Sequence, residues 1–374
     1  MLVTILIFIV ILGILVFVHE FGHFIVAKKT GMVVEEFGFG LFVRAIGIQK
    51  LPEGWKIIWG NKSPQNRDHT VYSLSWFPVG GFVRIMGENN EDAHNPQSFV
   101  NKGFWARFFT LIAGVLMNVV LAWVLLSIGF GIGIPTAIQS ASELPPQATF
   151  YDQHPGIADV TINTPAQKAG MKPEDLILSI DGKAFEQTSG IKNYIQSHTG
   201  QPLNFKILRG SQTINLSITP EASAEGKGFI GVGLATFGKL KYPWALTFTE
   251  GAKSTGVALI NIVLGLYHLV RDRIGLAAIG GPIKIAALVG QARESGFSSL
   301  LSLTVMLSLS LAVLNILPIP ALDGGRVLFL IIEKFRGKRN NQHIEQTVNA
   351  IGLVLLLFLV LIVSIHDVMG ILKK

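Results

Sequence analysis

Four long stretches of the chain contain no Asp, Glu, Lys or Arg, and they constrain the fold more than any other feature. They cover residues 2–18, 108–135, 297–322 and 346–365. A helix rises about 1.5 Å per residue, so about 20 apolar residues cross the hydrocarbon core of a bilayer. Only 15% of the residues are charged, whereas soluble domains carry about 25%. The sequence therefore predicts a polytopic α-helical membrane protein with about four transmembrane helices.

Basic residues beside these stretches predict their orientation, because Lys and Arg gather on the cytoplasmic side. Lys28 and Lys29 follow the first stretch, Arg107 precedes the second, and four basic residues lie within 334–339. We expect these flanks to be cytoplasmic and the segment from about 135 to 296 to lie on the opposite side. The uncharged stretch 254–270 is of borderline length. We interpret it as an interfacial helix, the alternative being a fifth span that would reverse the orientation of everything after it.

Two β-like regions interrupt the apolar stretches. Between the first two, VYSLSWFPVGGFVRIMG predicts two strand-like arms around a turn at residues 78–81, a hairpin dipping into the membrane interface. A plain structural hairpin is the alternative. From about 155 to 221, short alternating strands surround TPAQKAGMKPEDLILSIDG, a string that resembles the equivalent stretch of bacterial PDZ domains. Such domains bind an extended peptide along a strand edge; the alternative is a rigid spacer without a ligand.

The motif HEFGH at His19–His23 carries the strongest chemical signal. Positions four apart lie on one face of a helix, so His19 and His23 can turn ring nitrogens toward one ion, with Glu20 beside them. This is the arrangement of zinc metalloproteases, in which Glu20 would act as the general base. The motif ends an uncharged stretch, where such a cluster is costly unless it is paired or metallated.

A third zinc ligand must come from elsewhere, because two histidines leave a catalytic zinc site incomplete. The chain has no cysteine, so the ligand must be a His or a carboxylate. Asp323 is the only acidic residue within 297–332 and follows Pro318 and Pro320, which break the third apolar helix at membrane depth. We predict Asp323 as that ligand; a turn residue capping the next helix is the alternative.

The expected organisation has one inserted PDZ-like α+β domain and a membrane-associated β hairpin region. In chain order it comprises transmembrane helix 1 with HExxH (1–26), the membrane-associated β region (27–106), transmembrane helix 2 (107–135), the PDZ-like domain (140–222), a linker with an interfacial helix (223–296), transmembrane helix 3 ending in NxxPxPxLDG (297–322), a cytoplasmic connection (323–345) and transmembrane helix 4 (346–366).

HEFGH, FPVGGFVRIMGE, the PDZ-like insertion, GGPIKIA and NILPIPALDGG occur in the order typical of bacterial site-2 proteases, and the chain resembles that family along nearly its whole length. The regulator-of-sigma-E type of zinc intramembrane protease is the nearest match in pattern. The resemblance implies Zn²⁺ held by His19, His23 and Asp323, with Glu20 as catalytic base. It also implies substrate contacts at Asn315, Pro318 and Pro320 of the second motif and at Gly80, Gly81 and Phe82 of the hairpin. The best-known members carry two tandem PDZ domains, whereas this chain has room for one.

The resemblance implies a metalloendopeptidase of the bacterial inner membrane that acts in regulated intramembrane proteolysis. Its substrates would be single-pass membrane proteins, such as anti-sigma-factor-type regulators, and remnant signal peptides. The PDZ domain would be extracytoplasmic, the active site would face the cytoplasmic side, and no nucleic acid is expected as a partner. The alternatives are a non-catalytic PDZ membrane scaffold or chaperone and a zinc transporter.

Overall fold

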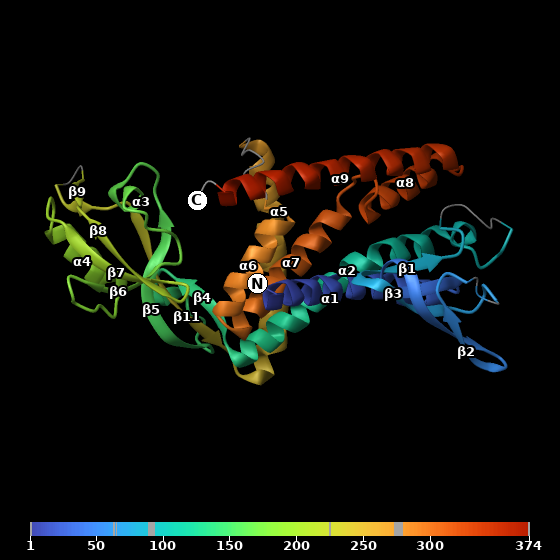
Figure 1. Ribbon diagram of the computed structural model, residues 1–374, viewed down its shortest axis with the longest axis horizontal. Helices are drawn as coiled ribbons and strands as arrows, with labels where there is room; N and C mark the ends of the chain where they lie inside the picture. The colour runs from blue at the N-terminus through green and yellow to red at the C-terminus, as the bar shows by residue number, and fades with distance from the viewer. Residues whose placement is uncertain are drawn as a thin grey trace. The chain divides into compact units, whose positions relative to one another are not determined.

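The computed structural model describes residues 2–62, 64, 66–88, 94–223, 226–272 and 280–372, and it combines long apolar helices with β-sheets (Figure 1). The described helices are α1 Leu2–Lys29, α2 Phe104–Ile132, α3 Pro165–Lys168, α4 Thr188–Ser197, α5 Trp244–Arg271, α6 Pro282–Glu294, α7 Phe297–Ile316, α8 Asp323–Arg336 and α9 Gln342–Leu372, with short 3-10 turns at Phe99–Asn101 and Ala141–Glu143. The strands are β1 Val34–Leu51, β2 Gly54–Trp59, β3 Val71–Ile85, β4 Ile134–Ile138, β5 Thr149–Val160, β6 Leu176–Ile180, β7 Leu203–Arg209, β8 Gln212–Ile218, β9 Glu221–Ala222, β10 Gly228–Phe229 and β11 Val232–Lys241.

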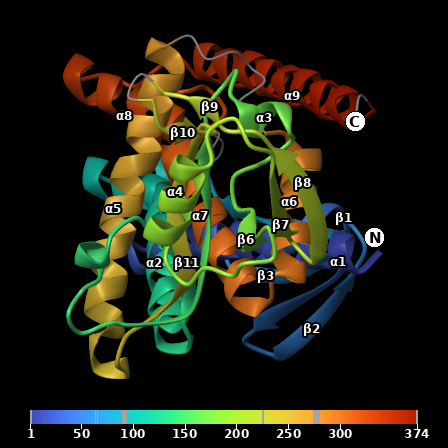
Figure 2. The same cartoon turned by 90° about the vertical axis from the view of Figure 1, so that its left-hand side faces the viewer.

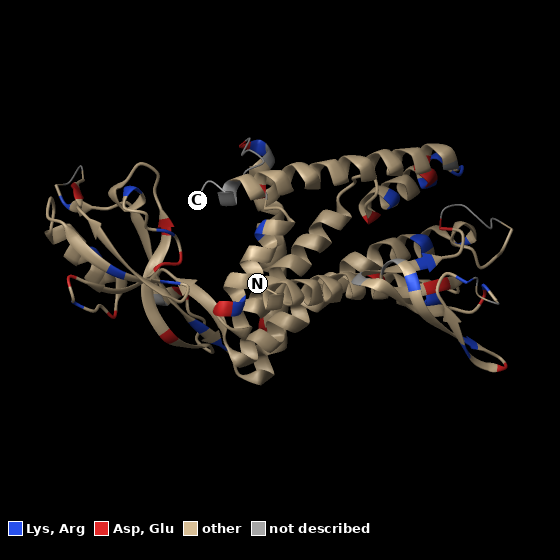
Figure 3. Ribbon diagram, in the orientation of Figure 1, with Lys and Arg blue, Asp and Glu red and all other residues tan. Residues whose placement is uncertain are grey.

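Within these residues, five helices are long and apolar enough to cross a membrane: α1, α2, α7, and the apolar parts of α5 and α9. Lys, Arg, Asp and Glu are sparse along them and gather at their ends and in the β regions (Figure 3). The protein is therefore a multi-pass membrane protein in composition and secondary structure. Helix α5 covers the stretch for which the sequence predicts an interfacial helix, and it is the least apolar of the five. The number of crossings stays a prediction.

The chain divides into two compact units. The first contains Met1–Val124, Lys253–Gly290 and Leu303–Lys374, and the second contains Leu125–Ala252 and Gln291–Ser302. Both predicted motifs, HEFGH and NILPIPALDGG, belong to the first unit.

The first unit carries a sheet of order β2-β1-β3, in which β3 turns back on itself around β1. Residues 36–39 of β1 pair with residues 71–74 of β3 on one side and with residues 81–84 on the other. The sequence predicts that the two arms form one hairpin, but the structure places β1 between them. Gly38 allows this, because a Cβ there would lie 2.5 Å from the Phe82 ring and 2.7 Å from Ser73 Oγ. Residues 81–85 therefore form the last described strand at that edge.

The second unit contains a sheet of order β4-β11-β5-β6-β7-β8, with helix α4 beside the strands (Figure 2). Its core is almost entirely aliphatic and includes the buried side chains of Ile157, Ile177, Ile180, Ile191, Leu203, Phe205, Ile207 and Ile218. Under the sheet, the fully buried Asp175 carboxylate accepts two hydrogen bonds of 2.7 Å from Arg209. These bonds raise the pKa of Arg209, so its guanidinium stays charged beside the Asp175 carboxylate.

Candidate active site

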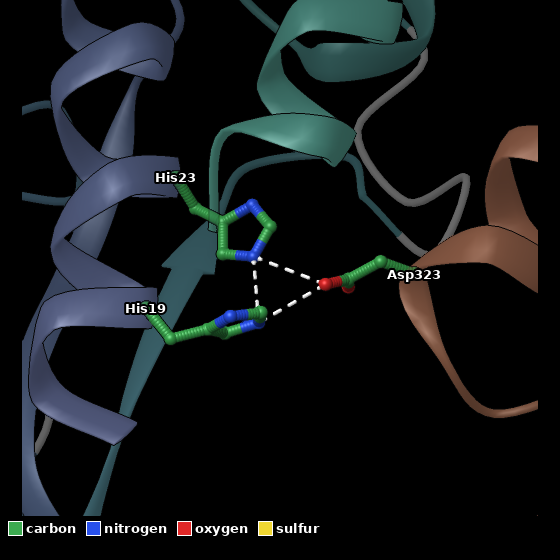
Figure 4. A group of neighbouring side chains, drawn as sticks. All are labelled: His19, His23 and Asp323. Carbon is green, nitrogen blue, oxygen red and sulfur yellow. Dashed lines mark hydrogen bonds and ion pairs between the residues drawn. The ribbon is translucent and has the colours of Figure 1, made fainter. Parts of the chain in front are cut away.

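The structure brings His19, His23 and Asp323 together although more than half of the chain separates them in sequence (Figure 4). The two histidines lie one turn apart on α1, and their Nε2 atoms are 3.3 Å from each other. Asp323 is the first residue of α8, and its Oδ2 lies 3.0 Å from His19 Nε2 and 3.4 Å from His23 Nε2. Three potential metal-binding atoms therefore converge on one point.

These distances fit a zinc ion. Ligand atoms at three corners of a tetrahedron, with bonds of about 2.0–2.1 Å, lie about 3.3 Å from one another. In addition, Asp323 Oδ2 is buried against the two histidine rings, a costly position for a carboxylate oxygen unless a cation stands beside it. Two imidazoles and one carboxylate are one of the ligand sets that bind zinc in catalytic sites. The residues present therefore fit the metal.

Helix α2 forms the back wall of this site by approaching α1 very closely. A Cβ on Gly22, the glycine of HEFGH, would lie 2.4 Å from the Ala113 carbonyl oxygen of α2. A Cβ on Gly114 would lie 2.3 Å from His23 Nε2 and 2.7 Å from His19 Nε2. The absence of both side chains leaves room for the two helices to touch and for the histidine rings to sit between them.

Two groups of α2 hold the outer nitrogens of the histidine rings. His23 Nδ1 lies 2.7 Å from the Thr110 carbonyl oxygen, and His19 Nδ1 lies 3.3 Å from the Asn118 amide. Such partners orient a ligand histidine and select its tautomer. The structure thus assigns each histidine a supporting group from the same helix.

Glu20 lies beside the sheet edge formed by the second arm of β3. Its Oε2 accepts a hydrogen bond of 3.0 Å from the Val83 backbone N–H. Val83 pairs with Phe37 of β1, and its N–H points away from that partner toward Glu20. A Cβ on Gly81 would lie 3.6 Å from Glu20 Cγ. The carboxylate therefore stands at the edge of a β-strand and next to the histidine pair.

The predicted hairpin residues lie at this edge. Gly80 has a positive φ of 82°, which places it in the left-handed region that glycine favours, at the point where β3 changes direction. Phe82 lines a polar cavity of about 480 Å³, together with Val83, Arg84, Glu88 and Arg326 and with Glu35, Arg67, Ile85 and Gly87. The sheet edge beside Glu20 is thus accessible from a hollow large enough for water.

The NILPIPALDGG segment ends α7 at Ile316 and turns the chain back to place Asp323. Asn315, in the last turn of α7, has its amide nitrogen 3.5 Å from His19 Nε2. Pro318 and Pro320 lie in the turn that follows. Ala321 adopts a φ of +70°, a strained conformation for a residue with a Cβ. The backbone of this turn is therefore held in shape by its surroundings.

Helix α9 supplies part of that support. The Asn349 amide oxygen accepts a hydrogen bond of 3.1 Å from the Ala321 N–H. A Cβ on Gly352 would lie 2.5 Å from Pro320 Cβ, so α9 packs directly against the turn. Two ion pairs hold α8 at its other side: Arg107 of α2 binds Glu333 at 2.7 Å, and Arg326 binds Glu88. These contacts fix the helix whose first residue is Asp323.

Sequence reasoning did not identify Val83, Thr110, Gly114, Asn118 or Asn349 as parts of the site. Thr110 and Val83 act through backbone groups, which no side-chain pattern reveals. Asn118 and Asn349 are isolated polar residues inside uncharged stretches, and a polar residue at membrane depth is a signal of a functional partner. That signal could have found the two asparagines but not what they contact.

A helix that presents His-Glu-x-x-His to a third carboxylate, with the glutamate free to face a polypeptide strand, defines a class of proteins, the zinc metalloproteases. Comparison with known proteins agrees. The sequence model of Peptidase family M50 matches residues 7–359. A protein of Nostoc sp. named as a zinc metalloprotease is 32% identical, over 93% of this chain and 91% of its own length. The regulator of sigma-W protease RasP of Bacillus subtilis is 27% identical, over 98% of each chain.

The chain belongs to Peptidase family M50. It is accordingly a zinc metalloendopeptidase of the site-2 type, and its cofactor is Zn²⁺. Among solved structures, the PDZ domain of an SdrC-like protein from Listeria innocua matches 22% of this chain and 92% of its own length, at 28% sequence identity and a TM-score of 0.20.

Proposed function

We propose that the protein hydrolyses peptide bonds in or near the transmembrane segments of single-pass membrane proteins, as a step of regulated intramembrane proteolysis. The observation that carries the proposal is the position of the site. His19, Glu20 and His23 are part of an apolar helix long enough to cross a bilayer, and Glu20 adjoins a strand edge that pairs with no further strand among the described residues. A substrate that reaches the site must leave its helix and can pair with that edge as a strand. Anti-sigma-type regulators and remnant signal peptides are substrates of this kind.

In this proposal His19, His23 and Asp323 hold the metal, and Glu20 is the base. When bound, Zn²⁺ polarises the scissile carbonyl and makes a water molecule a stronger acid. Glu20 Oε2 takes a proton from the attacking water and returns it to the departing amine nitrogen. The free edge of residues 81–85 aligns the substrate backbone by main-chain hydrogen bonds, and the Asn315 amide, next to His19, donates to the substrate strand. Substrate pairing at the edge competes with Glu20 for the Val83 N–H, which leaves the carboxylate free for proton transfer.

The directions in which α1, α2 and α7 run support an active site that faces the cytoplasmic side. Along α2, Asn118 lies by His19 and Thr110 by His23, so α2 runs opposite to α1. The Ser308 hydroxyl of α7 donates to the Asn118 carbonyl, level with His19, and the segment after α7 brings Asp323 within 3.4 Å of His23, further along α1. Helix α7 therefore runs in the same sense as α1. The chain between α2 and α7 must then start and finish on one side of the membrane, the side opposite the basic flanks.

Contacts of α6 support an interfacial position for α5. One end of α6 lies near the end of α9, since the Lys284 N–H donates to the Asp367 carboxylate at 3.1 Å. The other end lies near the start of α1, where a Cβ on Gly290 would be 3.3 Å from Thr4 Cγ2. Residues 272 and 280 are eight steps apart, a reach of about 28 Å, less than the hydrocarbon core of about 30 Å. This short reach supports a helix α5 that ends on the side on which it began. This favours four crossings, with the inserted domain on the extracytoplasmic side of a bacterial inner membrane.

The exposed face of the first-unit sheet supports a membrane-associated β region. Trp55, Ile57 and Trp59 alternate along β2, and each is about 60% exposed. Two of their cross-strand partners on β1, Ile46 opposite Trp59 and Ile48 opposite Ile57, extend the apolar face, whereas Lys50 is opposite Trp55. Tryptophan concentrates at membrane interfaces. We infer that this face lies in the headgroup region beside α1.

The test is cleavage by the full-length protein reconstituted in liposomes with a single-pass model substrate, followed by mass spectrometry of the products. We expect a cut within or next to the transmembrane segment. Glu20→Gln should retain zinc and lose cleavage by at least about 100-fold. Glu53→Gln, at a side chain that is 82% exposed on the turn before β2, is the matched control and should cleave normally. Cleavage by Glu20→Gln would contradict the mechanism. Zinc flux into the liposomes without cleavage would indicate a transporter instead.

A further inference from the structure

Asn118 is a completely buried polar side chain in the middle of the apolar helix α2. Its amide nitrogen lies 3.3 Å from His19 Nδ1, and its amide oxygen, also buried, has no hydrogen-bond partner among the residues that the structure describes. Its backbone carbonyl accepts a hydrogen bond of 2.8 Å from Ser308 of α7. An unpaired buried amide oxygen costs about 1–3 kcal/mol, so its presence calls for an explanation.

His23 shows which protonation state the cluster requires. Its Nδ1 lies 2.7 Å from the Thr110 carbonyl oxygen, and a carbonyl oxygen can only accept a hydrogen bond. His23 Nδ1 therefore carries a ring proton, and in the neutral ring, the form that can bind a metal, the Nε2 atom that faces Asp323 keeps its lone pair. A ring in this state can bind a metal through Nε2.

His19 needs the same state, because its Nε2 also faces the cluster, 3.0 Å from Asp323 Oδ2. Its Nδ1 must then carry a proton and needs an acceptor. The amide nitrogen of Asn118 is a donor and cannot fill that role. Half a turn of the Asn118 amide about its last torsion exchanges nitrogen and oxygen almost in place. The oxygen then accepts from His19 Nδ1–H, and the amide nitrogen takes the former place of the oxygen.

We propose that Asn118 is a positioning residue that fixes the tautomer and orientation of His19, by accepting a hydrogen bond through its amide oxygen when zinc is bound. Asn118 and the Thr110 carbonyl are eight residues apart on one helix, so α2 sets the state of both ligand histidines. The hydrogen bond from the Ser308 hydroxyl to the Asn118 carbonyl links this part of α2 to α7, the helix that precedes Asp323. The inference rests on the proposed ligand role of His19. Loss of such an outer partner lowers metal affinity by about 10–100-fold.

The zinc dissociation constant of the full-length protein in detergent, measured by chelator competition, tests this role. Asn118→Leu has a similar size but no acceptor, and it should weaken zinc by about 10–100-fold. Asn118→Asp keeps an acceptor and has no donor, so it should stay within about threefold of the wild type or bind more tightly. Leu116→Ala, at a position of α2 that is 51% exposed, is the control and should bind zinc as the wild type does.

Two results would overturn the proposal. One is an Asp variant that loses as much affinity as the Leu variant, since that pattern means that the amide acts as a donor. The other is a Leu variant with unchanged affinity. If a variant does not fold, histidine ¹⁵N NMR of the zinc-loaded wild type decides: a proton on His19 Nδ1 supports the proposal, and a proton on Nε2 overturns it. If His19 is not a zinc ligand, the pattern is different, because His19→Ala would then bind zinc as well as the wild type.

Discussion

Replacement of Gly114 by alanine should destroy the metal site while leaving the helices in place. The added Cβ would lie 2.3 Å from His23 Nε2 and 2.7 Å from His19 Nε2, and real Cβ atoms essentially never come closer than 3.0 Å to another heavy atom. A ring or a helix must therefore move by at least about 0.7 Å, whereas metal–ligand distances tolerate about 0.2 Å. The tight contact between Gly22 and Ala113 shows that α2 already lies directly against α1.

We expect Gly114→Ala to weaken zinc binding by at least about 100-fold, equivalent to about 2.8 kcal/mol. The assay is chelator competition on the full-length protein in detergent, with a thermal unfolding scan of the metal-free chain to establish folding. Gly256→Ala is the matched control, because Gly256 lies in helix α5 with no atom within 4 Å of the added Cβ. It should leave zinc affinity unchanged. A folded Gly114→Ala protein with wild-type zinc affinity would refute the geometry of the site.

Three further substitutions test separate parts of the account. Asp323→Asn should weaken zinc by more than about 100-fold in the same competition assay, because a neutral amide replaces the carboxylate of the proposed site; unchanged metal content would remove Asp323 from the site. Asn349→Ala leaves the strained Ala321 N–H without its acceptor, which costs about 1–3 kcal/mol, so calorimetry should show a lower Tm and zinc titration a weaker site; unchanged values would mean that α9 does not hold the turn. Asp175→Ala removes the partner of Arg209, which is 29% exposed, and should lower the free energy of unfolding of the second unit by about 2–3 kcal/mol. Proteolysis of that unit should rise while zinc affinity stays constant. A fall in zinc affinity would contradict the independence of the two units.

The chemistry of this chain could be predicted where one helix carries it. The four-residue spacing of His19 and His23 places both rings on one face, and no other part of the chain alters that relation. Asp323 was predictable because two prolines break a helix inside an apolar stretch, which indicates a backbone that lines a site. Asp323 is the acidic residue that follows this break. The structure places all three together, as the sequence predicted; their roles as ligands remain to be tested.

Contributions that cross between helices could not be predicted in the same way. Gly114 acts through a missing side chain, and Thr110 and Val83 act through backbone groups, so their roles appear only once α1, α2 and β3 are packed. The arrangement of β3 on both sides of β1 depends on Gly38, whose lack of a Cβ carries no signal in a single sequence. Helix α5 illustrates a different limit, because its length suits both a span and an interfacial helix. Only its neighbours, α6 above all, favour one of them.

The coordination of zinc in the purified full-length protein tests the central claim most directly. We predict an X-ray absorption spectrum at the zinc edge with two imidazole nitrogens at about 2.0–2.1 Å and oxygen ligands at about 2.0–2.2 Å. One oxygen should be lost in Asp323→Ala, and the whole spectrum should persist in Glu20→Gln, which cleaves no substrate. Three or more imidazoles, or a spectrum that Asp323→Ala leaves unchanged, would contradict the site formed by His19, His23 and Asp323.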